Sequence, residues 1–301
     1  MLALLFPGQG SQRPGMGAPW RDHPAWAVAE AVASATGRDV AGLLLDADAD
    51  TIQQTRNAQL AAFTLSAIVL DAARAAGLDT TQVAATAGHS LGEYSALLAA
   101  GALDLETGAR LVAARGDAMQ HAADTNPGTM AAVLGLEWSE VQAACAAVVD
   151  AWPANDNAPG QVVVAGTAAG VEAAGDACKA TGAKRVLALR VGGAFHSPLM
   201  APAQPLLDAA LAEAAFRDPV VPVVTNADAR EARDGFADSL SRQLVSPVRW
   251  RQSLQALAAL GVTRTLELGP GTELSGMVKR TLEGVDRAAV ATPDDLGAVL
   301  G

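Results

Sequence analysis

Cysteine, aromatic side chains and clustered positive charge are all scarce in this sequence. Its 301 residues include two cysteines, Cys145 and Cys178, which provide neither a disulfide framework nor the spacing of a cysteine metal site. Aromatic residues make up 4% of the chain and apolar residues 50%, so the core must be built from closely packed Ala, Val and Leu. We therefore expect a cytoplasmic protein without a metal or another cofactor.

The charge balance also limits the partners. A formal net charge of −11 excludes a general affinity for nucleic acid, which requires clustered Lys and Arg, and disfavours anionic membranes. The apolar residues 2–6 lack a basic flank and end at Pro7, too early for a secretory signal, and no run approaches the length of a membrane span. We expect no nucleic acid, no membrane and, without an obvious association helix, a monomer.

One stretch carries the pattern of a nucleophile turn. Gly88-His89-Ser90-Leu91-Gly92 stands between residues 83–87, which favour a short buried strand, and a run of helix-forming residues that stops at Gly101. Such a turn exposes the serine Oγ and aims the backbone N–H of Leu91 at charge developing on an attacked carbonyl. A Gly-x-Ser-x-Gly pattern also occurs in structural turns, but this context favours Ser90 as a nucleophile.

A nucleophilic serine needs a base, and the chain has only four histidines. The side chain of His89 should diverge from that of its neighbour Ser90, and His23 and His121 are predicted at the surface. His196 lies at a loop-to-helix junction, from which an imidazole can reach the turn. A lone histidine is more often structural than catalytic, and the presence of Ser90 favours a catalytic role for His196.

A long helix predicted from residue 103 places an arginine on its apolar side. Residues on that side recur at steps of three and four: Leu105, Gly108, Val112, Arg115 and Met119. A guanidinium buried there is costly unless a carboxylate compensates its charge. That carboxylate can belong to the protein or to a substrate, and the pattern leaves both alternatives open.

Two loops are further candidates. Residues 7–12 form a glycine-rich loop after the first strand, which fits a tight turn and lacks the lysine of a phosphate-binding loop. The composition of residues 155–160, Asn-Asp-Asn-Ala-Pro-Gly, predicts a second loop. Its asparagines can cap the neighbouring helix or face a ligand, and capping is favoured.

The order of predicted elements divides the chain. Residues 125–191 alternate strand, helix, strand, helix and strand, which predicts a small inserted α+β domain within a large domain formed by residues 1–124 and 192–301. The five elements are placed at 129–134, 139–151, 161–165, 170–181 and 185–189. In the large domain we predict helices at 20–36, 59–76, 199–215, 250–260 and 272–282, strands at 220–225 and 265–268, and a frayed tail after residue 284.

Six motifs together resemble one enzyme family. They are Phe6–Gln12, Gly88–Glu93, Arg115 with Met119, Ala194–His196, Ser246–Trp250 and Glu267–Gly271. Their order and separations are similar to those of malonyl-CoA:acyl carrier protein transacylases, and the resemblance spans nearly the whole chain. It implies an α/β fold, with an α/β-hydrolase-like core, a parallel sheet and a nucleophile elbow, plus a small inserted ferredoxin-like α+β subdomain.

The resemblance also implies a reaction. Ser90 would attack the thioester of malonyl-CoA, His196 would take its proton, and the backbone N–H groups of Gln9 and Leu91 would hold the oxyanion. The malonyl group would remain on Ser90 until the phosphopantetheine thiol of an acyl carrier protein accepts it, a ping-pong mechanism without a cofactor. Arg115 would bind the free malonyl carboxylate.

Further substrate residues complete the predicted site. By the resemblance, Met119 and Phe195 would line it, with Phe195 filling the space that a methylmalonyl branch needs. Asn157 would join them if the asparagines of residues 155–160 face a ligand. The backbone carbonyl of Arg249 would orient His196, in place of the acid of a full triad.

Other activities on the same turn stay open. A serine hydrolase or thioesterase, an acyltransferase acting in trans in polyketide synthesis or malonate decarboxylation, and a docking protein without chemistry are the alternatives. An acidic carrier would need a local basic surface, and the candidates are Lys184, Arg185 and Arg190, or Lys279 and Arg280.

Overall fold

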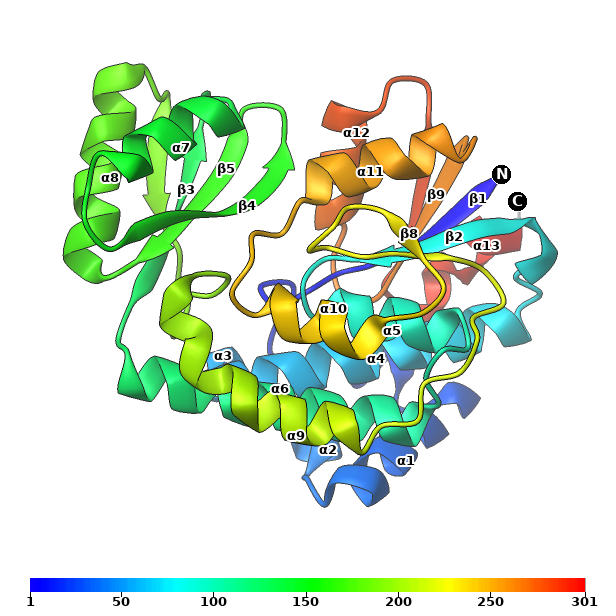
Figure 1. Ribbon diagram of the computed structural model, residues 1–301. Helices are drawn as coiled ribbons and strands as arrows, with labels where there is room; N and C mark the ends of the chain where they lie inside the picture. Colours follow the sequence, from blue (N-terminus) through cyan, green and yellow to red (C-terminus); the bar gives the residue numbers. More distant parts are fainter. Residues whose placement is uncertain (301) are drawn as a thin grey trace.

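Two separate β-sheets organise the protein in the computed structural model, which describes residues 1–300 (Figure 1). The larger sheet has six strands in the order β10-β9-β1-β2-β7-β8 and the smaller has four in the order β4-β5-β3-β6. Figure 1 shows the smaller sheet with α7 and α8 on one side of the molecule, and the start of β1 on the opposite side. The predicted α/β class, with a largely parallel sheet and a separate small sheet, is confirmed.

The large sheet is parallel except at one edge. Its strands are β1 (Leu2–Phe6), β2 (Val83–Gly88), β7 (Val223–Val224), β8 (Glu231–Ala232), β9 (Arg264–Leu268) and β10 (Asp286–Val290). Only β8 runs antiparallel to its neighbour, β7. In parallel strands the carboxyl ends meet at one edge of the sheet, so the segments that follow β1 and β2 lie side by side there.

Helices cover both faces of this sheet. The α-helices of this part are α1 (Ala27–Thr36), α2 (Val40–Leu45), α3 (Ala49–Gln53), α4 (Thr55–Ala75), α5 (Gly92–Ala99), α6 (Leu105–Thr125), α9 (Gln204–Ala212), α10 (Phe236–Gln243), α11 (Trp250–Ala259), α12 (Glu273–Thr281) and α13 (Gly297–Leu300). Short 3₁₀ turns are η1 (Ala18–Trp20), η2 (Pro24–Trp26), η3 (Thr80–Gln82), η4 (Pro198–Ala203) and η5 (Pro293–Leu296). Figure 1 shows α6 and α9 running together below α10.

Alternation along β1 explains the two layers. Leu4 and Phe6 point into the core formed with α4, α5 and α6, whereas Ala3 and Leu5 point into the core formed with α11 and α12. Successive side chains of a strand face opposite sides, so an almost wholly apolar strand is what a sheet buried on both faces requires.

The small sheet is a separate antiparallel unit. Its elements follow in the order β3 (Thr129–Leu134), α7 (Trp138–Ala146), β4 (Ala151–Ala158), β5 (Gln161–Gly166), α8 (Ala168–Thr181) and β6 (Arg185–Ala188), with each neighbouring strand pair antiparallel. This is the β-α-β-β-α-β order. Five of the six elements lie where the sequence predicts them.

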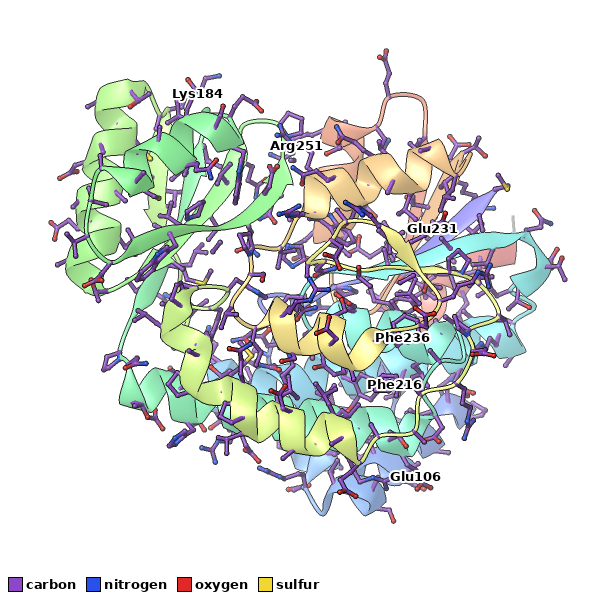
Figure 2. All side chains as sticks on the ribbon, viewed as in Figure 1. Glu106, Lys184, Phe216, Glu231, Phe236 and Arg251 are labelled. Carbon is purple, nitrogen blue, oxygen red and sulfur yellow. The ribbon has the colours of Figure 1, made fainter. Side chains whose placement is uncertain are left out.

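The sixth element corrects a prediction. Residues 155–160 were predicted as a loop, but Asn155 and Asp156 belong to β4, which pairs with β5. The polar composition is tolerated because β4 is an edge strand, where Pro153 also fits. The free edge of β4 faces the large domain: the Asp156 N–H donates to the Val248 carbonyl at 2.9 Å, and Arg251 of α11 pairs with Asp156 at 3.1 Å (Figure 2).

Four further predictions in the large domain are wrong in detail. The tail after residue 284 contains β10, which pairs in parallel with β9 instead of fraying. The helices predicted at 20–36 and 199–215 begin as 3₁₀ turns, η2 and η4, because prolines restrict their first turns. The strand predicted at 220–225 is reduced to Val223–Val224.

Helix α4 departs from the expectation that no run is long enough to span a membrane. It has 21 residues and a mean hydropathy of 1.2 in its most apolar window, and it is the one such helix among residues 1–300. However, 83% of that window is buried inside the protein, as in the central helix of a globular core. Its hydrophobicity is therefore accounted for by packing.

The close approach of β1, β2 and α5 gives a stability prediction. A Cβ added at Gly92 would lie 2.0 Å from the Phe6 carbonyl oxygen, so Gly92→Ala must displace backbone, and we expect a loss of about 2–3 kcal/mol in the free energy of unfolding. Gly276 on α12 has open space around its Cβ position, so Gly276→Ala should gain about 0.5–1 kcal/mol. Urea denaturation of both variants checks this, and equal effects would contradict the tight packing.

Candidate active site

Ser90 lies in a strained turn between β2 and α5. Its φ angle is 52°, in the left-handed region of backbone conformation that residues other than glycine rarely adopt. Two side chains bind its backbone: the Ser90 N–H donates to Asn226 Oδ1 at 2.6 Å, and Gln243 Nε2 donates to the Ser90 carbonyl at 3.1 Å. A Cβ at Gly88 would lie 1.9 Å from the backbone of Gly92, so the turn requires both glycines. The surrounding hydrogen bonds hold the strained conformation that presents Oγ.

The structure brings Ser90 and His196 together. Ser90 Oγ lies 2.7 Å from His196 Nε2, and His196 Nδ1 lies 2.9 Å from the carbonyl oxygen of Gln243. A carbonyl only accepts, so Nδ1 carries the proton and Nε2 is left to accept the hydroxyl proton of Ser90. Burial, together with the positive charge of Arg115, lowers the pKa of His196 to about 3. The imidazole is therefore neutral at neutral pH.

The carbonyl that orients His196 belongs to a different residue from the predicted one. The prediction named Arg249, but the Arg249 carbonyl accepts from the N–H and Oγ of Ser253 in the first turn of α11, at 2.9 and 3.0 Å. Gln243 ends α10, and the last carbonyls of a helix lack partners within it. The Gln243 carbonyl is therefore free to accept from His196, and Arg249 of the Ser246–Trp250 motif does not supply that acceptor.

Arg115 is buried beside the serine. Its side chain is among the largest fully buried ones, with 1% exposure, and it lies 5.7 Å from the ring centre of Tyr94. Its Nη atoms donate to Gln59 Oε1 at 2.6 Å, to Gln243 Oε1 at 2.9 Å and to Ser90 Oγ at 3.1 Å. All three acceptors are neutral oxygens.

The described chain does not supply the carboxylate that would compensate the charge of Arg115. No carboxylate of residues 1–300 forms an ion pair with this guanidinium, although Glu93 is near enough to contribute to its electrostatics. Nε also has no hydrogen-bond partner in the described chain. The described protein gives this cation amide and hydroxyl oxygens as hydrogen-bond acceptors, and it gives the cation no carboxylate as an ion-pair partner.

A pocket of about 240 Å³ opens onto Ser90 and His196. The predicted substrate residues Met119, Phe195 and Asn157 all line it, and so does Gln9. The full lining is Pro7, Gly8, Gln9, Gly10, Ser11, His89, Ser90, Met119, Met130, Asn155, Asn157, Val163, Leu189, Val191, Phe195, His196, Glu273, Leu274 and Met277. Both domains contribute, so the pocket lies at their junction.

Two of these side chains are fixed by neighbours. Met119, one turn after Arg115 on α6, accepts a hydrogen bond from Gln59 Nε2 at its Sδ, 3.2 Å away. Asn157 caps no helix, and its Oδ1 lies 2.8 Å from His89 Nε2, which as the donor must carry a proton. The ring of His89 thus turns away from Ser90, as the sequence predicts for adjacent side chains.

The predicted oxyanion donors lie on either side of the turn. Leu91 is the N-cap residue of α5, and Gln9 lies in the loop after β1, which packs so closely on the turn that a Cβ at Gly8 would lie 2.3 Å from the His89 carbonyl oxygen. Among residues 1–300, the N–H groups of Gln9 and Leu91 have no protein acceptor. Two free donors beside a nucleophile are what an oxyanion site requires.

Several residues that hold the site were not predicted. Gln59, Asn226 and Gln243 are completely buried polar residues, and Glu93 is a completely buried carboxylate. The two glutamines lie on apolar sides of α4 and α10, so the argument that singled out Arg115 also applies to them. Asn226 follows β7 in a loop and carries no comparable signal.

Metal binding is not supported by the part of the chain that the structure describes. No group of three or more His, Cys, Asp and Glu side chains within residues 1–300 has the geometry to hold a metal ion. The site combines a serine, a neutral imidazole, two free backbone donors and a buried cation. This set can attack a carbonyl, hold the resulting oxyanion and bind an anionic group nearby.

Known proteins share this architecture over its full length. Residues 3–293 match the acyl transferase domain family. A malonyl CoA-acyl carrier protein transacylase from Escherichia coli (strain K12) is 41% identical, covering 99% of this chain and 98% of the relative, and one from Bacillus subtilis (strain 168) is 39% identical, covering 98% and 95%. A solved malonyl-transacylase in complex with a type II PKS acyl-carrier protein superposes with a TM-score of 0.95 at 37% identity, covering 99% of this chain and 98% of that one. The chain therefore belongs to the acyl transferase domain family, among the malonyl CoA-acyl carrier protein transacylases.

Proposed function

We propose that this protein transfers a malonyl group from malonyl-CoA to the phosphopantetheine thiol of an acyl carrier protein. The observation that carries the proposal is Arg115, a buried guanidinium 3.1 Å from Ser90 Oγ without an ionic partner in the described chain. An acyl group with a free carboxylate supplies that partner when its thioester reaches Ser90. The names of the relatives support the same substrate and acceptor.

The reaction has two symmetrical halves. In the first, the Ser90 hydroxyl proton moves to His196 Nε2 as Oγ bonds to the thioester carbon, and the N–H groups of Gln9 and Leu91 bind the oxyanion. The carbon–sulfur bond then breaks, and the leaving coenzyme A sulfur takes the proton from His196. In the second half the carrier thiol gives its proton to His196, its sulfur attacks the ester, and Ser90 Oγ leaves and recovers the proton.

We also propose a hydrolase-like core and a ferredoxin-like subdomain for the two parts of the fold. A six-stranded, largely parallel sheet with a serine turn after β2 supports an α/β-hydrolase-like core in residues 1–124 and 192–301. The β-α-β-β-α-β order supports a ferredoxin-like subdomain in residues 125–191. We place the substrate between these two units, since Met130 and Asn157 of the smaller one line the Ser90 pocket.

The position of the pocket also bears on carrier docking. Leu189, Val191 and Met277 line it, so the basic residues beside them flank the route to Ser90. Of the predicted clusters, we favour Arg190 together with Lys279 and Arg280, since these exposed residues are closest in sequence to the lining. Lys184 lies at the outer end of the small sheet (Figure 2).

The monomeric state, the cytoplasmic location and the lack of a cofactor stay predictions.

Phe195 supports a preference for an unbranched malonyl unit. It is 5% exposed, precedes His196 and lines the pocket that opens onto Ser90, so its ring limits the space in that pocket. One methyl group changes binding in an apolar pocket by about 1–3 kcal/mol. We therefore expect a moderate preference over methylmalonyl-CoA and not complete exclusion.

Product analysis distinguishes transfer from hydrolysis on the same turn. Incubation with malonyl-CoA should yield a malonyl ester on Ser90, and addition of a holo acyl carrier protein should move that group to the carrier thiol. Mass spectrometry of both proteins follows each step, with Ser90→Ala as the control. Free malonate released at the same rate with and without the carrier would instead identify a hydrolase.

The role of Arg115 predicts a change in acyl preference. In Arg115→Ala, kcat/KM for malonyl-CoA should fall by about 10²-fold or more, because truncating one side of a buried charge pair costs about 2–5 kcal/mol. Acetyl-CoA has no free carboxylate, so its kcat/KM should change by less than about tenfold. Initial rates with both thioesters give the ratio.

Arg74 provides a matched control for that variant. Its guanidinium donates to the Ala99 carbonyl at 2.9 Å, away from the Ser90 pocket. Arg74→Ala should retain the preference for malonyl-CoA. Equal losses with malonyl-CoA and acetyl-CoA in Arg115→Ala would contradict the assignment of the carboxylate to Arg115.

The neutral imidazole predicts a specific pH dependence of stability. The pKa of His196 is about 3 when folded, against 6.5 for an ordinary histidine, so below pH 6.5 the unfolded chain binds a proton that the folded one does not. Wild type should lose stability relative to His196→Gln as the pH falls from 6.5 toward 3, by up to about 1.4 kcal/mol per pH unit, with no difference in slope above 6.5. Urea denaturation of both proteins from pH 8 to 5 measures this. Parallel curves below pH 6 would show that His196 titrates normally.

A further inference from the structure

Glu93 is a buried acidic side chain that the reaction does not use. It lies in the first turn of α5, three residues after Ser90, and is 0% exposed. It does not line the Ser90 pocket. Its Oε2 accepts two hydrogen bonds, from Gln243 Nε2 at 2.7 Å and from the Asn226 N–H at 3.0 Å. Both donors belong to residues that contact the site.

Asn226 fixes the nucleophile turn. Its side-chain Oδ1 accepts from the Ser90 N–H at 2.6 Å, and its Nδ2 donates to the Gly88 carbonyl at 2.7 Å. These two bonds span the strained residue, whose φ is 52°. The bond from the Asn226 backbone to Glu93 anchors this clamp to α5.

Gln243 fixes the other two groups. Its backbone carbonyl accepts from His196 Nδ1, and its side-chain Oε1 accepts from Arg115 Nη2. Its Nε2 donates to Glu93 Oε2 and to the Ser90 carbonyl. One glutamine therefore connects the base, the cation and the nucleophile turn.

The direction of each bond gives Glu93 a part in this arrangement. An amide can be turned so that its oxygen and nitrogen exchange places. The carboxylate of Glu93 accepts and does not donate, so it holds Nε2 on its own side and turns Oε1 toward the donor Arg115. Without that acceptor, the Ser90 carbonyl and the donor Arg115 would still favour the same orientation of the Gln243 amide, but Nε2 would lose the shorter of its two hydrogen bonds.

Glu93 also faces the buried charge. Burial raises the pKa of its carboxyl group to about 7, and the hydrogen bonds from Asn226 and Gln243 and the charge of Arg115 oppose that shift. Its other oxygen, Oε1, is buried without a hydrogen-bond partner in the described chain. The position thus has room for one amide nitrogen in place of Oε1, with both existing bonds retained.

We propose that Glu93 is a positioning residue: through Asn226 and Gln243 it sets the placement of Ser90, His196 and Arg115 for acyl transfer. The proposal rests on the proposed function for its substrate but not for the geometry it describes. A carboxylate in the first turn of a helix also stabilises that helix through its dipole. That purely structural role would lower stability on substitution and leave the reactivity of each folded molecule unchanged.

Two variants separate these roles. Glu93→Met fills a similar space but accepts no hydrogen bond, so we expect the rate of Ser90 acylation to fall by about 10²-fold, as for other misplaced catalytic groups. Glu93→Gln can retain both bonds through its carbonyl oxygen and should stay within about tenfold of wild type. Glu93→Ala repeats the comparison where Glu93→Met does not fold.

The readouts must distinguish positioning from folding. Labelling of Ser90 by a fluorophosphonate reports nucleophile activation without any acyl substrate, and rates are normalised to the folded fraction measured by circular dichroism. With thioesters, Glu93→Met should lower kcat for malonyl-CoA and acetyl-CoA alike, through Ser90 and His196. It should raise KM for malonyl-CoA alone, through Arg115.

Glu267 is the matched control. It is also a buried glutamate, 1% exposed with a pKa raised to about 7, and it accepts hydrogen bonds from the N–H groups of Leu274 and Ser275. None of its bonds reaches Ser90, His196 or Arg115. Glu267→Met should lose stability and keep the rate of fluorophosphonate labelling.

The outcomes are separable from those of the proposed function. Glu93→Met that labels like wild type, with a loss of stability similar to that of Glu267→Met, overturns the positioning role. Glu93→Gln that is as slow as Glu93→Met shows that the charge and not the hydrogen bonds matters, which also overturns it. Wild type that labels with the fluorophosphonate but forms no malonyl ester refutes the proposed substrate, and the labelling rates still decide the role of Glu93.

Discussion

The burial of one positive charge next to the nucleophile is the constraint on which the rest of this site depends. A guanidinium removed from water is costly, and an ion pair within the protein is the usual compensation. Here Arg115 receives amide and hydroxyl oxygens instead, from Gln59, Gln243 and Ser90. The charge is stabilised enough to be held in place and is left able to bind a further anion. The completely buried glutamines on α4 and α10 follow from that requirement, because only neutral acceptors leave the cation available.

The same cation affects the choice of base. It lowers the pKa of His196 in the direction that burial already favours, so the imidazole stays neutral while it lies beside a positive charge. A full triad would place a carboxylate on Nδ1, which would stabilise the protonated form. The Gln243 carbonyl fixes the same tautomer without adding a negative charge. An acid at that position would also compete with the substrate carboxylate for Arg115, so a carbonyl is consistent with a site built to bind an anion.

The sequence predicts the helices and strands that follow from hydrophobic periodicity. It also predicts the polar and reactive residues that interrupt this periodicity. Ser90, His196 and Arg115 are identifiable because each is conspicuous in its local context, and the structure places His196 and Arg115 each within hydrogen-bonding distance of Ser90 Oγ. The edge strands β4 and β10 are not predicted, because polar residues interrupt both and Pro153 also interrupts β4. The Arg249 carbonyl was chosen from a motif, whereas the carbonyl that contacts His196 is determined by where α10 ends. Helix ends vary with packing and leave little trace in the sequence.

The missed residues share one property. They bind backbone atoms or one another, as Asn226, Gln243 and Glu93 do. These contacts form only in the folded protein, where β7, α10 and α5 meet at the carboxyl edge of the sheet. The reactive groups are recognisable individually because their chemistry is unusual, but the groups that aim them are ordinary amides and a carboxylate. A strained serine, a neutral histidine and a buried arginine come from three distant segments, and hydrogen bonds of fixed direction are what hold their atoms in register. The specificity of this site for its chemistry therefore lies as much in the direction of those bonds as in the three groups themselves.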